Sequence, residues 1–155
     1  MRGLVTETHP ASDFAHKRFW AVLEERHPEE IKRRAHKARL HWQRGLPENA
    51  LVVTMFINPT QSECGVCLGR NKSIGAVDVE ERLKPFQDRI NEQLGLDPAQ
   101  SFPDFPFASR WSVDCYDEDN WPAMVDWMVT EASRYERVLS ALLRGSSPNR
   151  IAGGA

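Results

Sequence analysis

A dense run of cations is the first feature of this sequence that carries chemistry. Six lysines and arginines fall between Lys32 and Arg44, and no acidic residue interrupts them. Cations at this density can neutralise phosphates, and an aromatic ring among them can stack on a nucleobase. The run therefore predicts a nucleic-acid contact surface that consists of Lys32, Arg33, Arg34, Lys37, Arg39, Trp42 and Arg44. The glutamates that precede it, from Glu24 to Glu30, also allow a solvated helix face whose charges pair internally.

Two cysteines, Cys64 and Cys67, have the C-x-x-C spacing that zinc sites and thiol-exchange sites share. Their surroundings have the pattern of a strand, in which a separation of three residues places two side chains on opposite faces. The histidine pair upstream, His36 and His41, has a spacing that suits neither one helix face nor one strand face. We therefore expect both cysteines to be buried as small apolar side chains, with no metal site.

Four acidic residues, Asp114, Asp117, Glu118 and Asp119, carry the oxygen ligands that Mg²⁺ prefers. They also come just before a predicted helix, where carboxylates are stabilised by the positive end of the helix dipole. A restriction-type nuclease would need an acid-x-Lys triplet on an adjoining strand, and Glu30-Ile31-Lys32 falls in a predicted helix. Helix capping is therefore the predicted role, with a metal-dependent nuclease or small hydrolase as an alternative function.

Three further residues, Arg110, Asp114 and Trp127, are candidates for a pocket or a partner-binding site. Arg110 and Asp114 share the outer face of a predicted strand, and Trp127 lies beside the apolar stripe of the last predicted helix. Exposed arginine and tryptophan side chains commonly anchor protein partners. A salt bridge on the strand and a tryptophan at the rim of the core would also explain them. Because no Ser/His/Asp arrangement, phosphate-binding glycine loop or dinucleotide fingerprint occurs, the sequence predicts no catalytic residue and no cofactor.

The composition sets outer limits on these hypotheses. The chain has 155 residues and a formal net charge of −2, which fits one domain and excludes a generally basic nucleic-acid coat. Local charged patches remain compatible with that balance. Three cysteines are too few for a disulfide scaffold, and no apolar run approaches the roughly 20 residues of a membrane helix. We expect a cytoplasmic protein without a membrane partner.

The positions of these residues depend on the elements that carry them. Ser12 is a predicted N-cap for a first helix, whose apolar side includes Phe14, Phe19 and Leu23. A second helical stretch is predicted from Pro28 through Ala38, with extended chain from about residue 39. The apolar run 51–57 predicts a central strand, and 63–69 predicts its hairpin partner.

The second half of the chain predicts a helix over 78–94, a half-buried strand over 109–116 and a long last helix. Pro85 should divide the first of these after Lys84, and Gly95 should end it. The last helix is capped by Asp119 or Asn120 and ends at Gly145. Its apolar residues recur at steps of four and three: Trp121, Val125, Met128, Ala132, Tyr135, Leu139 and Leu142.

Together these elements predict an α+β fold, with a small and mostly antiparallel sheet packed by N-terminal, central and long C-terminal helices. We expect one domain over 12–144, a flexible lead-in over 1–11 and a disordered tail over 145–155.

The stretch ASRWSVDCYDEDNWPAMVDWMVTEASRYERVL resembles the C-terminal part of a bacterial and archaeal family whose function is uncharacterised. Members of that family occur alone or appended to restriction-type nuclease domains. The matching features are the strand at 51–57, Leu94-Gly95, Ala108-Ser109-Arg110-Trp111, the acids 117–119 and Asp126-Trp127. The resemblance covers about residues 14–143, with Trp111 in place of isoleucine and a proline-rich 97–107 loop as departures. It implies the same fold and a setting near restriction or phage defence, and it transfers no catalytic residue.

The functional hypothesis is a non-catalytic binding or accessory domain that contacts nucleic acid through the basic run. A second hypothesis is a homodimer or protein-partner module, because the near-heptad repeat of the last helix could pack across a two-fold axis.

Overall fold

The structure is a computed structural model that describes residues 14–46, 51–68, 81, 83–97 and 107–145. The predicted cap at Ser12, the lead-in 1–11, most of the 97–107 loop and the tail beyond Gly145 lie outside the described residues. No helix in the described part of the chain has the length and apolar character needed to cross a membrane.

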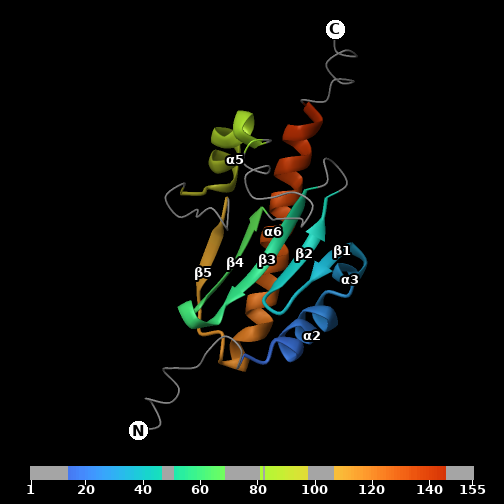
Figure 1. Ribbon diagram of the computed structural model, residues 1–155, viewed down its shortest axis with the longest axis vertical. Coiled ribbons are helices and arrows are strands. Elements are labelled where there is room, and N and C mark those ends of the chain that lie inside the picture. The colour runs from blue at the N-terminus through green and yellow to red at the C-terminus, as the bar shows by residue number, and fades with distance from the viewer. Residues whose placement is uncertain (1–13, 47–50, 69–80, 82, 98–106, 146–155) are drawn as a thin grey trace.

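Within the described residues, five strands and several helices follow one another (Figure 1). The first half holds α2 (His16–Arg26), α3 (Glu29–Arg33), β1 (Arg34–Lys37), β2 (His41–Gly45), β3 (Val52–Asn58), η2 (Pro59–Gln61) and β4 (Glu63–Leu68). The second half holds η3 (Lys84–Phe86), α5 (Gln87–Leu94), β5 (Ser109–Ser112), η5 (Glu118–Asn120) and α6 (Trp121–Gly145).

The five strands form one antiparallel sheet in the order β1-β2-β3-β4-β5, so each strand pairs with its neighbour in sequence. The predicted α+β fold is therefore confirmed. β3 is central, as its apolar sequence predicted, and six of its seven residues are buried. Cys64 and Cys67 on β4 are both buried, and their separation of three residues places them in different apolar clusters.

The long helix α6 packs on β3 and β4 and runs behind the sheet in Figure 1. All seven residues of its predicted apolar stripe, from Trp121 to Leu142, are buried, which confirms the seam between helix and sheet. Tyr135 belongs to this seam, and its hydroxyl donates to the Phe107 carbonyl oxygen at 2.6 Å. Burial raises the pKa of the Tyr135 hydroxyl well above its usual range.

Two shorter helices cover the two ends of α6. α2 contributes Phe19, Trp20 and Leu23 to the core, and the ring of Phe19 meets that of Trp121 edge-on at 5.4 Å. α5 contacts the other half of α6, and its residues Ile90 and Leu94 are buried in the core (Figure 1). Gly95 ends α5 in the left-handed conformation, with φ of 64°, and Pro85 lies in the short 3-10 turn before it, as predicted.

The prediction of helix through Ala38 is wrong, because the chain becomes extended at Arg34 and forms β1. The helical spacing of Ile31, Ala35 and Ala38 does not mark a buried face, since Ile31 is 43% exposed. Pairing with β2 overrides the helix propensity of the alanines. β1 is an edge strand whose four side chains are all exposed.

The predicted strand over 109–116 is shorter in the structure, where β5 ends at Ser112. Local hydrogen bonds replace the strand pairing after that point: the Asp114 carboxylate accepts from the Tyr116 backbone N–H at 3.0 Å. The capping residue before the last helix also differs from the prediction. Asp117, rather than Asp119 or Asn120, caps η5 by accepting from the Asp119 N–H at 3.0 Å, and α6 follows directly.

Candidate functional site

The basic run divides between the surface and the core. Lys32, Arg33, Arg34, Lys37 and Arg39 are exposed on α3, on β1 and in the turn after it. Trp42 and Arg44 are fully buried, because β2 lies inside the sheet and alternate residues of it face the helices. The prediction that Trp42 and Arg44 belong to a nucleic-acid surface is therefore wrong. We call the five exposed cations the basic edge.

Part of the basic edge is paired with acidic residues, as the flanking glutamates predicted. Glu24 lies 3.5 Å from Arg34 Nη1 and 3.8 Å from Lys37 Nζ. These two cations also lie over the ring of Trp42, at 5.2 and 5.7 Å from its centroid. Lys32 and Arg39, by contrast, form no ion pair with any residue that the structure describes. The basic edge thus holds two cations, Lys32 and Arg39, that no acidic side chain among the described residues neutralises.

Arg44 is the centre of a buried ion-pair network that sequence reasoning missed. Its guanidinium donates to both carboxylate oxygens of Glu30, at 3.1 and 2.5 Å, and both side chains are 1% exposed. The remaining nitrogen, Nη1, donates to Ser133 Oγ at 3.2 Å and to Glu136 Oε1 at 3.1 Å. The network joins α3, β2 and α6, so it fixes the position of three elements at once.

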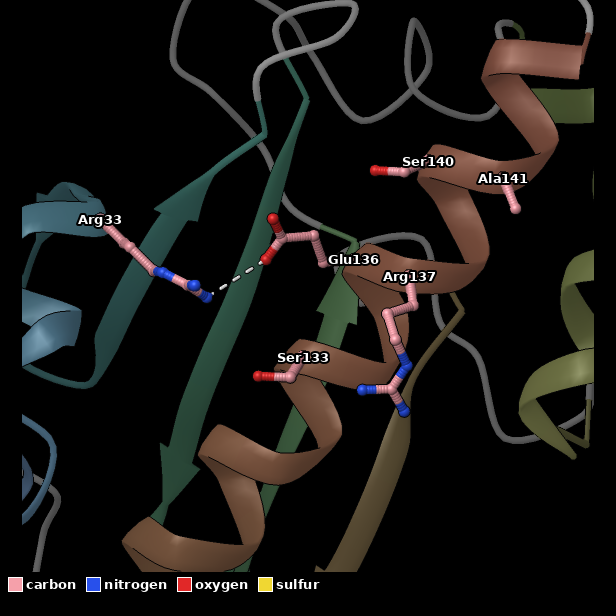
Figure 2. A pocket seen from close by; sticks show the side chains of 6 residues that line it. All are labelled: Arg33, Ser133, Glu136, Arg137, Ser140 and Ala141. Carbon is pink, nitrogen blue, oxygen red and sulfur yellow. Dashed lines mark hydrogen bonds and ion pairs between the residues drawn. The ribbon is translucent and has the colours of Figure 1, made fainter.

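A pocket of about 500 Å³ lies directly beside this network. Its walls come from α3 and the second half of α6 and consist of Arg33, Ser133, Glu136, Arg137, Ser140 and Ala141. Figure 2 shows the Arg33 side chain reaching toward Glu136, which lies between Ser133 and Ser140 along the helix. Arg137 forms no ion pair with a residue in the described ranges. The pocket therefore combines two arginines, two hydroxyls and one carboxylate.

A weak signal for this pocket was present in the sequence. Ser133, Glu136 and Ser140 recur at steps of three and four on α6, as do the apolar residues, but on a different face. We call this face, together with Asp126 seven residues before Ser133, the polar stripe of α6. The partners of Ser133 and Glu136 in this stripe, Arg33 and Arg44, are about 90 to 100 residues away, and no local pattern links them.

The three residues proposed for a pocket or partner site do not come together. Arg110 donates to Glu63 at 2.7 Å and lies over the Phe56 ring, on the sheet face away from α6. Trp127 extends from α6 and packs on Trp111 at 5.7 Å, on the opposite face of the sheet. Asp114 is exposed and accepts from a backbone N–H. Arg110 thus forms a salt bridge with Glu63 of β4, and Trp127 packs at the rim of the core.

The acidic cluster near η5 has structural partners. Asp114 and Asp117 accept backbone N–H groups, and Glu118 pairs with Arg18 of α2. Across the described residues, no three His, Cys, Asp or Glu side chains gather as a ligand set for a metal ion. The predicted capping role of this cluster is thus confirmed for Asp117.

Two of the cysteines, Cys64 and Cys115, have thiols of low reactivity. Burial raises the pKa of the Cys115 thiol to about 12, and it raises the pKa of Cys64 further. A thiol with so high a pKa is almost entirely protonated near neutral pH, so it is a poor nucleophile and metal ligand. Cys115 instead donates from Sγ to the Glu63 carbonyl oxygen at 3.3 Å.

Comparisons with protein-family models, with curated proteins and with solved structures find no match to this chain. The resemblance to the nuclease-associated family described above therefore stays a prediction.

Proposed function

We propose that this chain is a non-catalytic domain that binds nucleic acid through phosphate contacts at the basic edge. The observation that carries the proposal is the exposure of five cations within one eight-residue segment, which runs from α3 through β1, the first strand in the order of the described sheet (Figure 1). Lys32 and Arg39 are the principal contacts, because no acidic residue within the described chain neutralises them. Arg33, whose ion pair with Glu136 is long at 3.5 Å, is the third.

The burial of Trp42 changes what kind of recognition is expected. A buried indole cannot stack on a base, so the basic edge offers charge without an aromatic platform. Phosphate contacts position a nucleic acid but carry no sequence information. We therefore propose binding that is independent of sequence, with a dissociation constant on the order of 10⁻⁴ to 10⁻⁶ M at physiological salt.

The biological setting is a proposal that rests on the family resemblance. An accessory domain with sequence-independent affinity would hold a partner nuclease close to DNA or RNA, as restriction and phage defence require. Such a role needs no catalytic residue on this chain.

Fluorescence anisotropy with labelled single-stranded DNA, RNA and duplex DNA at 50 and 200 mM salt tests the proposal. With about three phosphate contacts, log K should fall against log salt with a slope of about −2 for single strands. The double variant Lys32→Glu/Arg39→Glu should remove most of the binding. These positions are exposed and outside the described ion pairs, so the fold should persist.

The matched control is Lys84→Glu/Arg89→Glu, which makes the same charge change on η3 and α5. It should leave binding within about twofold, since α5 lies well apart from β1 and α3 in Figure 1. Equal losses of affinity in both double variants would show that binding depends on the net charge of the protein and not on the basic edge. A variant that self-associates while it still binds would show that the charges protect the β1 edge from strand pairing.

A further inference from the structure

We propose that the pocket between α3 and α6 binds the phosphate group of a phosphate ester. Arg33, Arg137 and the Ser133 hydroxyl would be its donors. The inference deepens the proposed function, on which it rests only for one source of the ester, a nucleic-acid strand. Arg33 belongs both to the basic edge and to this pocket, so the two surfaces are continuous.

The charges around the pocket favour an anion. Three arginines, Arg33, Arg44 and Arg137, stand against two glutamates, Glu30 and Glu136, which leaves one positive charge. Glu30 is saturated by Arg44, with two hydrogen bonds in the interior. Glu136 accepts a hydrogen bond from Arg44 Nη1 at 3.1 Å. Part of its negative charge is therefore compensated by a buried arginine that does not line the pocket.

The buried network sets the orientation of the donor from α6. Ser133 Oγ accepts a hydrogen bond from Arg44 Nη1, so its own proton points elsewhere, and the hydroxyl lines the pocket. Arg44 cannot rotate away, because Glu30 holds its other two nitrogens. Arg44 is therefore a positioning residue that does not itself touch the ligand. Burying a charged guanidinium costs desolvation free energy. In this arrangement the buried Arg44 orients a ligand-binding hydroxyl as well as pairing with Glu30.

The two pocket arginines differ in their readiness to bind. Arg137 is exposed and has no ion pair with a described residue, so it can accept an anion without losing a contact. Arg33 Nη1 lies 3.5 Å from Glu136 Oε1, which is farther than the 3.1 Å between that oxygen and Arg44 Nη1. The Arg33 side chain is 48% exposed. A phosphate would draw Arg33 away from Glu136, because a guanidinium binds two phosphate oxygens with matched geometry.

The volume indicates what is attached to the phosphate. About 500 Å³ is several times the size of a phosphate ion and falls in the range of small-ligand sites. The pocket thus has room for a sugar or nucleoside beside the phosphate. A free phosphate ester, such as a mononucleotide, and the end of a nucleic-acid strand share this chemistry.

Isothermal titration of the full chain with inorganic phosphate and with AMP, at fixed ionic strength, tests the pocket. Arg137→Gln should weaken binding of both about tenfold or more, since a charge-assisted contact is lost. Arg89→Gln on α5 removes the same charge outside the pocket and should change affinity by less than about twofold. Equal affinities of the unmodified chain and Arg137→Gln, or no binding of either probe, would overturn the proposal.

Glu136→Gln provides the sharper test because it should raise the affinity for phosphate, whereas Arg137→Gln should lower it. If the ligand is an anion, removing this carboxylate frees Arg33 and should strengthen binding by about threefold to tenfold. A weaker affinity would contradict the proposal, because removing a negative charge beside Arg33 cannot weaken binding of an anion at this site. Thermal denaturation of each variant, and the exposed Arg137 position, separate these results from loss of folding.

Two oligonucleotides, one with a 5′-phosphate and one with a 5′-hydroxyl, separate the sources of the ester. A preference for the 5′-phosphate that Arg137→Gln abolishes would identify a strand end as the ligand. AMP binding without that preference would identify a free phosphate ester. Lys32→Glu/Arg39→Glu should lose oligonucleotide affinity but retain AMP binding, so failure of the basic edge and failure of the pocket remain distinguishable.

Discussion

Two faces of the same helix contact the rest of the fold by different means. The apolar seam of α6, from Trp121 to Leu142, meets the sheet through side chains that need no specific partner. The polar stripe meets α2, α3 and β2 through paired charges: Asp126 with Arg26 and His27, and Glu136 with Arg44 and Arg33. The strength of the seam depends on buried area, whereas the strength of the stripe depends on keeping both members of each pair.

The difference teaches what each face specifies. An apolar seam allows many close variants of one packing arrangement, because hydrophobic contacts are not directional. The Arg44 network accepts only the arrangement in which Glu30, Ser133 and Glu136 surround one guanidinium. It therefore fixes the position of α3 against α6, which is also the geometry that forms the pocket.

The largest expected effect comes from breaking the buried pair on one side. Arg44→Met leaves the Glu30 carboxylate buried without its partner, and it should lower the free energy of unfolding by about 3 to 5 kcal/mol. The double variant Arg44→Met/Glu30→Leu removes both charges and should recover most of that loss. Urea denaturation of the two variants measures the difference. Equal losses would mean that the network is stabilised by packing rather than by pairing.

The seam should respond to a truncation less severely and without rescue by a second change. Leu139→Ala removes a buried side chain, 1% exposed, and should cost about 3 kcal/mol through lost burial and the cavity that remains. Leu139→Met keeps the volume and should cost less than about 1.5 kcal/mol. The comparison uses the same urea midpoints. A Met variant as damaged as the Ala variant would show that the seam also depends on exact shape.

The same contrast explains what could be predicted from the sequence. The seam, the central strand and the helix stop at Gly95 follow from periodicity and local backbone preference, and the structure confirms all three. β1 could not be predicted this way, because Ala35 and Ala38 favour helix and only pairing with β2 makes the segment extended.

The candidate site was predicted in part for the same physical reason. The exposed cations from Lys32 to Arg39 follow from their density along the sequence alone. Arg44 and Trp42 were assigned to that surface because charge density does not reveal which strand lies inside the sheet. The pocket could not be predicted, because Glu136 and Arg137 are about 100 residues away from α3 in the sequence and only the fold brings them together.

Asp126 offers the smallest and most specific test of the polar stripe, because its pairs lie near solvent. Arg26 donates to both carboxylate oxygens, at 3.0 and 2.6 Å, and His27 Nε2 lies 2.7 Å from Oδ1. These hydrogen bonds, with that from Arg26 the largest cause, lower the pKa of Asp126 from 3.8 to about 2. A carboxylate whose pKa is lower in the folded state stabilises the fold above the unfolded pKa, and this contribution disappears as pH falls.

The unmodified chain should therefore lose its advantage over Asp126→Asn as pH falls from about 4 toward 2. Above that window the advantage should be small, because exposed ion pairs typically contribute about 0.2 to 1 kcal/mol. Urea midpoints of both proteins at pH 6, 4 and 3 measure it, and 0.5 M NaCl should reduce it at pH 6 but leave Arg44→Met as damaging as before. If salt weakened both effects equally, the buried network and the exposed pair would be one electrostatic surface, and the distinction between the interior and the rim of the polar stripe would fail.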